Sequence, residues 1–281
     1  MARRKLKSID DYVRALKNGY GKGELESYRP WLRVSDVPSK GRSSITQGIT
    51  VKREHHTLSD IETSMLYHAD FNKHVVDIRE QFPLFPLDIV QAIAENVGIA
   101  YPNVPKTKTP AVLTTDCLLT LRDQKYSFLA IAVKPSSELR IIRVREKLEI
   151  ERLLWESLGG RWMLVTEKNF SVTVTENLIW ISSVLRGEQF QRIALDSDHV
   201  ETLREAIAPR TYTIESITSL FAEILKIEDE EAKTVMKQLI WDQVLLINLD
   251  VPIEESGLIE VKEWILPVYN FISGETYDFS A

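Results

Sequence analysis

Apolar residues in the first 168 positions switch between helical spacing and short strand-like runs. Helical spacing predicts helices over about 8–17, from Ser59 onward, over 87–97 and over 140–157. Runs rich in β-branched and aromatic residues predict strands over 74–82, 111–121, 126–134 and 161–168. The glycine- and proline-rich stretch between the first two helices is typical of an extended arm with little regular structure. This order predicts an α/β fold, a mixed sheet flanked by helices.

After residue 169 the apolar spacing becomes mainly helical. It predicts helices over about 173–186, 197–207, 213–226 and 229–241, followed by strands over 244–250 and 258–266. Helices followed by a hairpin resemble a winged-helix module. We therefore expect two domains, 1–168 and a mainly helical, winged-helix-like 169–281.

Charge separates the same two regions. Residues 1–168 carry 27 Lys and Arg against 21 Asp and Glu, whereas residues 169–281 carry 8 against 20, although the whole chain has a net charge of −6. A basic front half suits contact with a polyanion, and the acidic half does not. No apolar run approaches the roughly 20 residues of a membrane span. With a single cysteine, Cys117, and no apolar segment behind the basic N-terminus, we expect a cytoplasmic protein without a signal peptide.

The predicted hairpin of 111–121 and 126–134 carries the first candidate chemistry. If it folds near residue 124, Asp116 lies opposite about residue 132, and Lys134 becomes its diagonal neighbour on the same face. A carboxylate beside an ammonium at a sheet end suits metal-assisted phosphodiester hydrolysis. An Asp and a Lys on a hairpin are also the ordinary components of a surface salt bridge, and spacing alone favours that interpretation.

Glu62 would supply a second carboxylate from a helix packed on the sheet, completing a site for one or two Mg²⁺ ions. It also stands three residues after Ser59, the spacing of a capping box, which accounts for it without any catalytic role. From the residues alone, a catalytic site is only one interpretation of Glu62, Asp116 and Lys134; a helix cap and a surface salt bridge are the other.

Ordered motifs favour the catalytic interpretation. They are Tyr28-x-Pro30-Trp31-Leu32, Val37-Pro38-Ser39-x-Gly41-Arg42-Ser43, His55-His56, Leu58-Ser59-Asp60-x-Glu62, 77–84 (DIREQFPL), Thr115-Asp116, Val133-Lys134-Pro135, 146–149 (EKLE) and Thr166-x-Lys168. In this series the chain resembles the TnsA family, the endonuclease subunits of heteromeric cut-and-paste transposons. The last 110 residues match far less well.

The resemblance implies a restriction-endonuclease-like catalytic domain with Glu62, Asp116 and Lys134 as its triad. It implies a Mg²⁺-dependent nick at the 5′ ends of a transposon, beside a TnsB-type recombinase, with Mn²⁺ able to replace Mg²⁺ and two ions expected. The acidic C-terminal domain would dock partners, including a TnsC-type ATPase. Alternatives are a stand-alone repair or junction nuclease of the same fold, and a non-catalytic adaptor.

One position departs from this nuclease pattern, in which the residue two before the lysine usually carries a side-chain oxygen. Ala132 stands there, so we expect Glu62, Asp116 and the carbonyl of Val133 to hold the metal, more weakly than with Gln at 132. The expected phosphate contacts are Arg42, Ser43, Lys52, Arg53, Lys73 and Arg79. Adjacent histidines without a third ligand, as in His55-His56, favour polar surface or local structure over metal ligands or DNA contacts.

Overall fold

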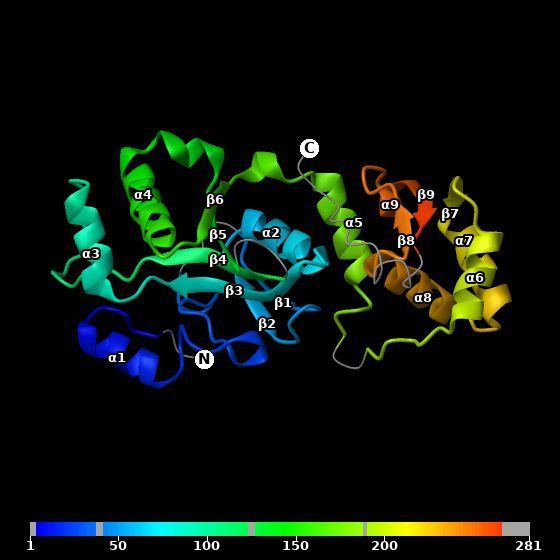
Figure 1. Cartoon of the computed structure of the whole chain (residues 1–281), viewed down its shortest axis with the longest axis horizontal. Coiled ribbons are helices and arrows are strands. Elements are labelled where there is room, and N and C mark those ends of the chain that lie inside the picture. Colours follow the sequence, from blue (N-terminus) through cyan, green and yellow to red (C-terminus); the bar gives the residue numbers. More distant parts are fainter. Residues whose placement is uncertain (1–3, 38–41, 123–126, 188–189, 266–281) are drawn as a thin grey trace. The chain divides into compact units, whose positions relative to one another are not determined.

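The computed structural model describes residues 4–37, 42–122, 127–187 and 190–265. The chain divides into two compact units, Met1–Phe170 and Ser171–Ala281, each described below by itself (Figure 1). The division lies close to the boundary expected after residue 168.

A four-stranded sheet in the order β3-β4-β5-β6 forms the centre of the first unit. The strands are β3 (Val75–Pro83), β4 (Thr114–Leu121), β5 (Phe128–Val133) and β6 (Arg161–Val165). β3, β4 and β5 are antiparallel neighbours, and β6 runs parallel to β5. A parallel neighbour needs a crossover connection, and α4 (Ile142–Ser157) provides it. The mixed sheet predicted from the sequence is confirmed.

Helices cover both faces of this sheet (Figure 1). On one face, Met65 and Leu66 of α2 (Asp60–Phe71) pack with Ile78, Cys117 and Ile131. The other face is covered by α3 (Leu87–Asn96) and α4, where Ile150 and Leu154 meet Leu118 and Ala130. Successive strand residues point to opposite faces, so strands buried on both sides read as nearly continuous apolar runs.

The hairpin of β4 and β5 has the predicted register. Cys117 pairs with Ile131 and Leu118 with Ala130, so the residue opposite 116 would be 132. The predicted turn near residue 124 lies outside the described residues, as does residue 126, the first of the predicted strand 126–134.

The N-terminal region contains more structure than the predicted irregular arm. α1 (Ile9–Lys17) packs against Trp31, and a 3-10 turn spans Leu25–Ser27. Strands β1 (Ser44–Gln47) and β2 (Glu54–Thr57) then form an antiparallel hairpin. The prediction missed this hairpin because its strands are only four residues long and rich in polar side chains. Pro38 and its neighbours through Gly41, part of one motif, lie outside the described residues.

The second unit combines helices with a small sheet of order β7-β9-β8. Its elements are α5 (Val172–Ser182), α6 (Ser197–Ala206), β7 (Thr211–Thr213), α7 (Ile214–Leu225), α8 (Asp229–Trp241), β8 (Leu245–Ile247), α9 (Ile253–Ser256) and β9 (Leu258–Trp264). The four predicted helices and both predicted strands are present, although the first helix ends earlier; residue 266 lies outside the described part. Among the described helices, none is both long and apolar enough for a membrane span.

Candidate active site

Glu62 lies in the first turn of α2, where it takes part in capping the helix. The Glu62 amide donates to Ser59 Oγ over 3.2 Å, and its Oε2 accepts from the amide of Leu58 over 2.9 Å. The expected capping box is thus shifted by one residue, because the carboxylate takes the Leu58 amide. Glu62 is only 8% exposed. Capping and a site role are compatible, since the cap fixes this carboxylate at the edge of the sheet.

Asp116 stands where the pairing between β4 and β5 ends. Its Oδ2 accepts from the backbone amide of Val133 over 2.7 Å, in place of the next ladder hydrogen bond. The same oxygen accepts from Lys134 Nζ over 2.7 Å. The predicted pairing of Asp116 with Lys134 is therefore present. Because the side chain of Asp116 is largely buried, the pair differs from an ordinary salt bridge at the surface.

Gln81 joins the two carboxylates. Its Nε2 lies 3.4 Å from Glu62 Oε2 and 3.4 Å from Asp116 Oδ1, and its Oε1 accepts from Thr114 Oγ1 over 3.0 Å. The backbone of Gln81 has a φ of +48°, an uncommon left-handed conformation for a residue other than glycine. This local departure from regular β3 geometry turns the amide toward the carboxylates. Gln81 belongs to the motif at 77–84, but the sequence alone indicates no role for it.

Glu151 is a further carboxylate that sequence analysis missed. It lies on α4, 6% exposed, and its Oε1 has no hydrogen-bond partner among the described residues. Burial, then the nearby negative charge of Asp116, raises its pKa to about 8. The signal was present in the sequence: Leu148 and Leu154 stand three residues before and after it, so this acid occupies a core position of the helix.

The site carries more buried negative charge than positive charge. Burial, followed by repulsion from Asp116, raises the pKa of Glu62 to about 7. Burial disfavours the charged form of Lys134, but Asp116 outweighs it and holds the lysine pKa above its usual value. One ammonium thus faces Glu62, Asp116 and Glu151. A buried group of acids with one cation is stabilised by an additional cation.

The donor atoms fit a divalent cation of the Mg²⁺ type. Within the described residues, no three His, Cys, Asp or Glu side chains come together as a ready metal-binding group. Glu62, Asp116 and the Val133 carbonyl supply only oxygen atoms, and Lys134 Nζ lies 2.7 Å from that carbonyl. Mg²⁺ prefers oxygen ligands, needs only one or two protein carboxylates and keeps several waters. Ala132 is fully buried and adds no side-chain ligand.

Two of the six expected phosphate contacts are buried in the protein. Arg53, 9% exposed, donates from Nη1 and Nη2 to the two carboxylate oxygens of Glu80 over 2.8 and 2.5 Å. Arg79, 7% exposed, has its Nε 3.3 Å from Asp77 Oδ2 and donates from Nη2 to Thr120. Their burial corrects the expectation and assigns both guanidinium groups to holding β3 in place.

The other expected contacts lie at or near the surface. Arg42 has 86% of its side chain exposed and forms an ion pair with Asp60 at 3.2 Å. Lys52 and Lys73 are exposed, and Ser43 is half-buried. For these four residues, DNA contact stays a prediction.

His55 is completely buried, with Nδ1 3.0 Å from Glu80 Oε2. The His56 amide donates to the other oxygen of Glu80 over 3.1 Å. The expected local structural role of this pair agrees with the geometry.

Comparisons with known proteins show similarity to a transposition endonuclease over part of the chain. Residues 72–167 match the family described as TnsA-like endonuclease N terminal, a range that includes Asp116, Lys134 and Glu151 but not Glu62. The chain is also 40% identical over 176 residues to the transposon Tn7 transposition protein TnsA of Escherichia coli. That alignment covers 63% of this chain and 63% of the relative. Both findings show similarity to TnsA proteins over part of the chain, which confirms the resemblance carried by its motifs.

Proposed function

We propose that this chain is a Mg²⁺-dependent DNA endonuclease that nicks the 5′ ends of a transposon, acting with a TnsB-type recombinase. The observation that carries the proposal is that Gln81 links Glu62 to Asp116 and that Lys134 is bonded to Asp116. Gln81, Asp116 and Lys134 also lie within the residues that match the TnsA-like endonuclease family. These three side chains come from separate elements, and spacing alone does not require them to meet.

The chain's own residues would divide the work as follows. Glu62, Asp116 and the Val133 carbonyl would hold the cation, which supplies charge neutralisation at the phosphate and a more acidic bound water. Lys134 has three ammonium protons, and Asp116 Oδ2 and the Val133 carbonyl accept two of its hydrogen bonds. The third N–H is left to hold the attacking water or a phosphate oxygen. Asp116 thereby fixes the direction of the lysine as well as binding the cation.

The Lys134→Ala variant tests the assignment most simply. We expect cleavage at the 5′ ends to fall by at least about 100-fold, because the variant removes the group that positions the nucleophile. The measurement is strand-specific cleavage of labelled transposon ends, with the exposed Lys108→Ala as the matched control.

The same assay separates the alternatives. A Lys134→Ala protein that still enters the transposase complex but does not cut supports the enzyme. Undiminished cutting by the variant favours the adaptor, and robust cutting by the wild-type chain without recombinase or ATPase favours the stand-alone nuclease.

We infer further that the second unit is a winged-helix-like domain that docks protein partners, including a TnsC-type ATPase. The order of helix, short strand, two helices and two strands, with β9 between β7 and β8, supports the winged-helix part. Acidic residues at the start of α8, Asp229 to Glu231, argue against its use as a DNA-reading helix, because they would repel phosphates.

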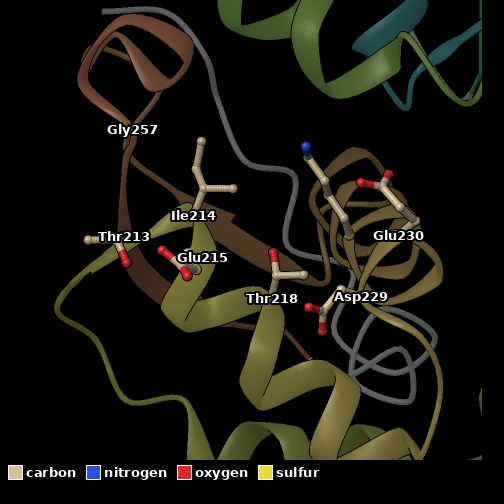
Figure 2. A pocket seen from close by; sticks show the side chains of 8 residues that line it. Thr213, Ile214, Glu215, Thr218, Asp229, Glu230 and Gly257 are labelled. Atoms are coloured by element: carbon tan, nitrogen blue, oxygen red, sulfur yellow. The ribbon is translucent and has the colours of Figure 1, made fainter.

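A pocket of about 430 Å³ supports partner docking (Figure 2). Glu215, Asp229 and Glu230 line it from the first turns of α7 and α8. Thr218 also lines it, and its Oγ1 is buried without a partner in the described part of the chain. Lys233 lines the pocket as well, but the three carboxylates outnumber its ammonium. Carboxylates in excess, beside an unused hydroxyl, suit an arginine or lysine side chain of a partner.

Neutralising this pocket tests the docking role. The Glu215→Gln/Asp229→Asn double variant should weaken binding of the TnsC-type ATPase and retain cleavage chemistry. The exposed Glu205→Gln on α6 should leave both binding and cleavage unchanged. Affinity measured by biolayer interferometry that is equal in all three proteins would exclude the pocket.

A further inference from the structure

Three residues on α4 form a charged row that ends in the candidate active site. Arg143, Lys147 and Glu151 follow one another at intervals of four residues, so they lie on the same side of the helix. Glu151, at the inner end, interacts electrostatically with both Asp116 and Lys134. At about 1.5 Å rise per residue, Lys147 and Arg143 lie roughly 6 and 12 Å farther along the helix axis. The row therefore leads outward from the catalytic residues.

The two cations of this row lie in a positive environment. Burial, then repulsion from Arg143 and from Lys134, lowers the pKa of Lys147. Lys147 makes no ion pair or hydrogen bond with any residue that the structure describes. Lys147, Arg143 and the catalytic lysine thus form a cluster of like charge beside the site. Because the positive charges of Lys147, Arg143 and Lys134 repel one another, an anion placed between them is stabilised.

Arg143 has a partner that an anion can displace. Its Nη1 lies 2.6 Å from Glu146 Oε2, with side chains 39% and 33% exposed. Ion pairs between partly exposed side chains contribute little to stability. A phosphate group, which accepts charge-assisted hydrogen bonds from arginine in a two-pronged geometry, competes well for the same guanidinium.

The beginning of α4 adds positive potential to the row. No side chain caps it, no acidic residue lies in its first turn, and Arg143 and Arg145 stand there instead. Free amide groups at a helix start carry partial positive charge, which most helices offset with acids. Ile141 and Ile142 at this end are 51% and 65% exposed, so the end is open to a ligand.

We propose that Lys147 and Arg143 hold the DNA phosphates that follow the scissile phosphate on one side, and so position the strand in the site. They are positioning residues, and the proposal rests on the proposed endonuclease function. Backbone phosphates are regularly spaced anions, which suits a row of cations leading away from catalytic groups. This surface replaces Arg53 and Arg79, whose guanidinium groups are bound to Glu80 and Asp77.

The salt dependence of DNA binding tests the proposal. Binding of the full chain to a fluorescent 30-base-pair duplex is measured from low to moderate salt in the presence of Ca²⁺, for wild type, Lys147→Gln, Arg143→Gln and the double variant. Each lost phosphate contact should reduce the slope of log K against log salt by about 0.9. The matched control is Arg152→Gln, on the same helix but held by Glu149 and Glu156.

We expect the double variant to lose about two units of slope, Lys147→Arg to retain the wild-type slope, and the control to retain it too. In cleavage assays with Mg²⁺, KM should rise in the double variant more than kcat falls. Lys147→Met, which keeps the aliphatic stem, provides a second neutral variant if Lys147→Gln folds poorly.

Three results would overturn the inference: a double variant with the wild-type slope, an equal loss in Arg152→Gln, or no duplex binding by wild type at low salt. Failure of the endonuclease proposal is distinguishable, because it would leave the slope difference intact while no protein cuts. If wild type cuts and the α4 variants bind and cut like it, only the inference fails.

Discussion

Buried acids in the first unit behave in two opposite ways. Glu80 on β3 is 2% exposed, and its two oxygens accept from Arg53, His55 and the His56 amide. Although burial opposes ionisation, the hydrogen bonds with Arg53 and His55 hold the pKa of Glu80 well below its usual value. Glu62 and Glu151 are equally buried, yet their pKa values are raised to about 7 and about 8.

The difference lies in the positive partners that each acid has. Glu80 has a bidentate arginine, whereas Glu62, Asp116 and Glu151 share a single lysine. A buried charge that is fully paired serves the structure, and breaking it is costly. A buried group of acids with too few cations lowers stability and is typical of a functional site. Glu80 and Gln81 are neighbours on β3, yet Glu80 belongs to the fully paired group and Gln81 contacts the acids that have too few cations.

The largest effect should follow from breaking the satisfied group. Glu80→Gln leaves Arg53 buried without its counter-charge, and we expect the free energy of unfolding to fall by about 3–5 kcal/mol. Urea denaturation of the full chain measures this. The matched control is Glu54→Gln on β2, next to Arg53 in the chain but exposed, which should change little. Equal stability of the Glu80→Gln protein and wild type would show that the paired Glu80 does not stabilise the fold.

The opposite effect should follow from removing an unsatisfied acid. The folded pKa of Glu151 is raised from 4.5 to about 8, so the folded state binds more protons between these values, and stability falls as pH rises through this window. Without divalent cations, Glu151→Gln should melt near the wild-type temperature at pH 4.5 and above it at pH 8. Differential scanning calorimetry measures the difference in melting temperature between the variant and wild type. A difference that shrinks as the pH rises would contradict the expected pH dependence.

The smallest effect concerns position 132. Ala132→Gln places an amide oxygen two residues before Lys134 and should lower the Mg²⁺ concentration needed for half-maximal cleavage by a few-fold, as about 1 kcal/mol of binding corresponds to roughly five-fold. Ala132→Ser, with a shorter hydroxyl, is the comparison variant. Identical Mg²⁺ titrations for both variants and wild type would show that the missing side-chain oxygen has no consequence.

Sequence patterns predicted the sheet, its flanking helices and the hairpin register. The hairpin could be predicted because strands 114–121 and 128–133 are apolar runs, each recognisable from its own residues. They placed Asp116 beside Lys134 for the same reason. Glu62 needed the family resemblance, since local pattern explains it as a cap. The roles of Gln81 and Glu151 depend on which elements pack together, and a local pattern does not contain that information. Arg53 and Arg79 were expected at the surface because charge alone does not reveal a buried partner.

We propose that Glu62 and Asp116, buried with too few positive partners, form a site for a divalent metal ion. Isothermal titration calorimetry with Mg²⁺ and Mn²⁺ tests it directly, on wild type, Asp116→Asn and the unit-two control Glu215→Gln. The account predicts binding by wild type and control, loss in Asp116→Asn, and tighter binding at pH 8 than at pH 6, since Glu62, with a pKa of about 7, must ionise. Equal binding by Asp116→Asn and wild type would contradict it.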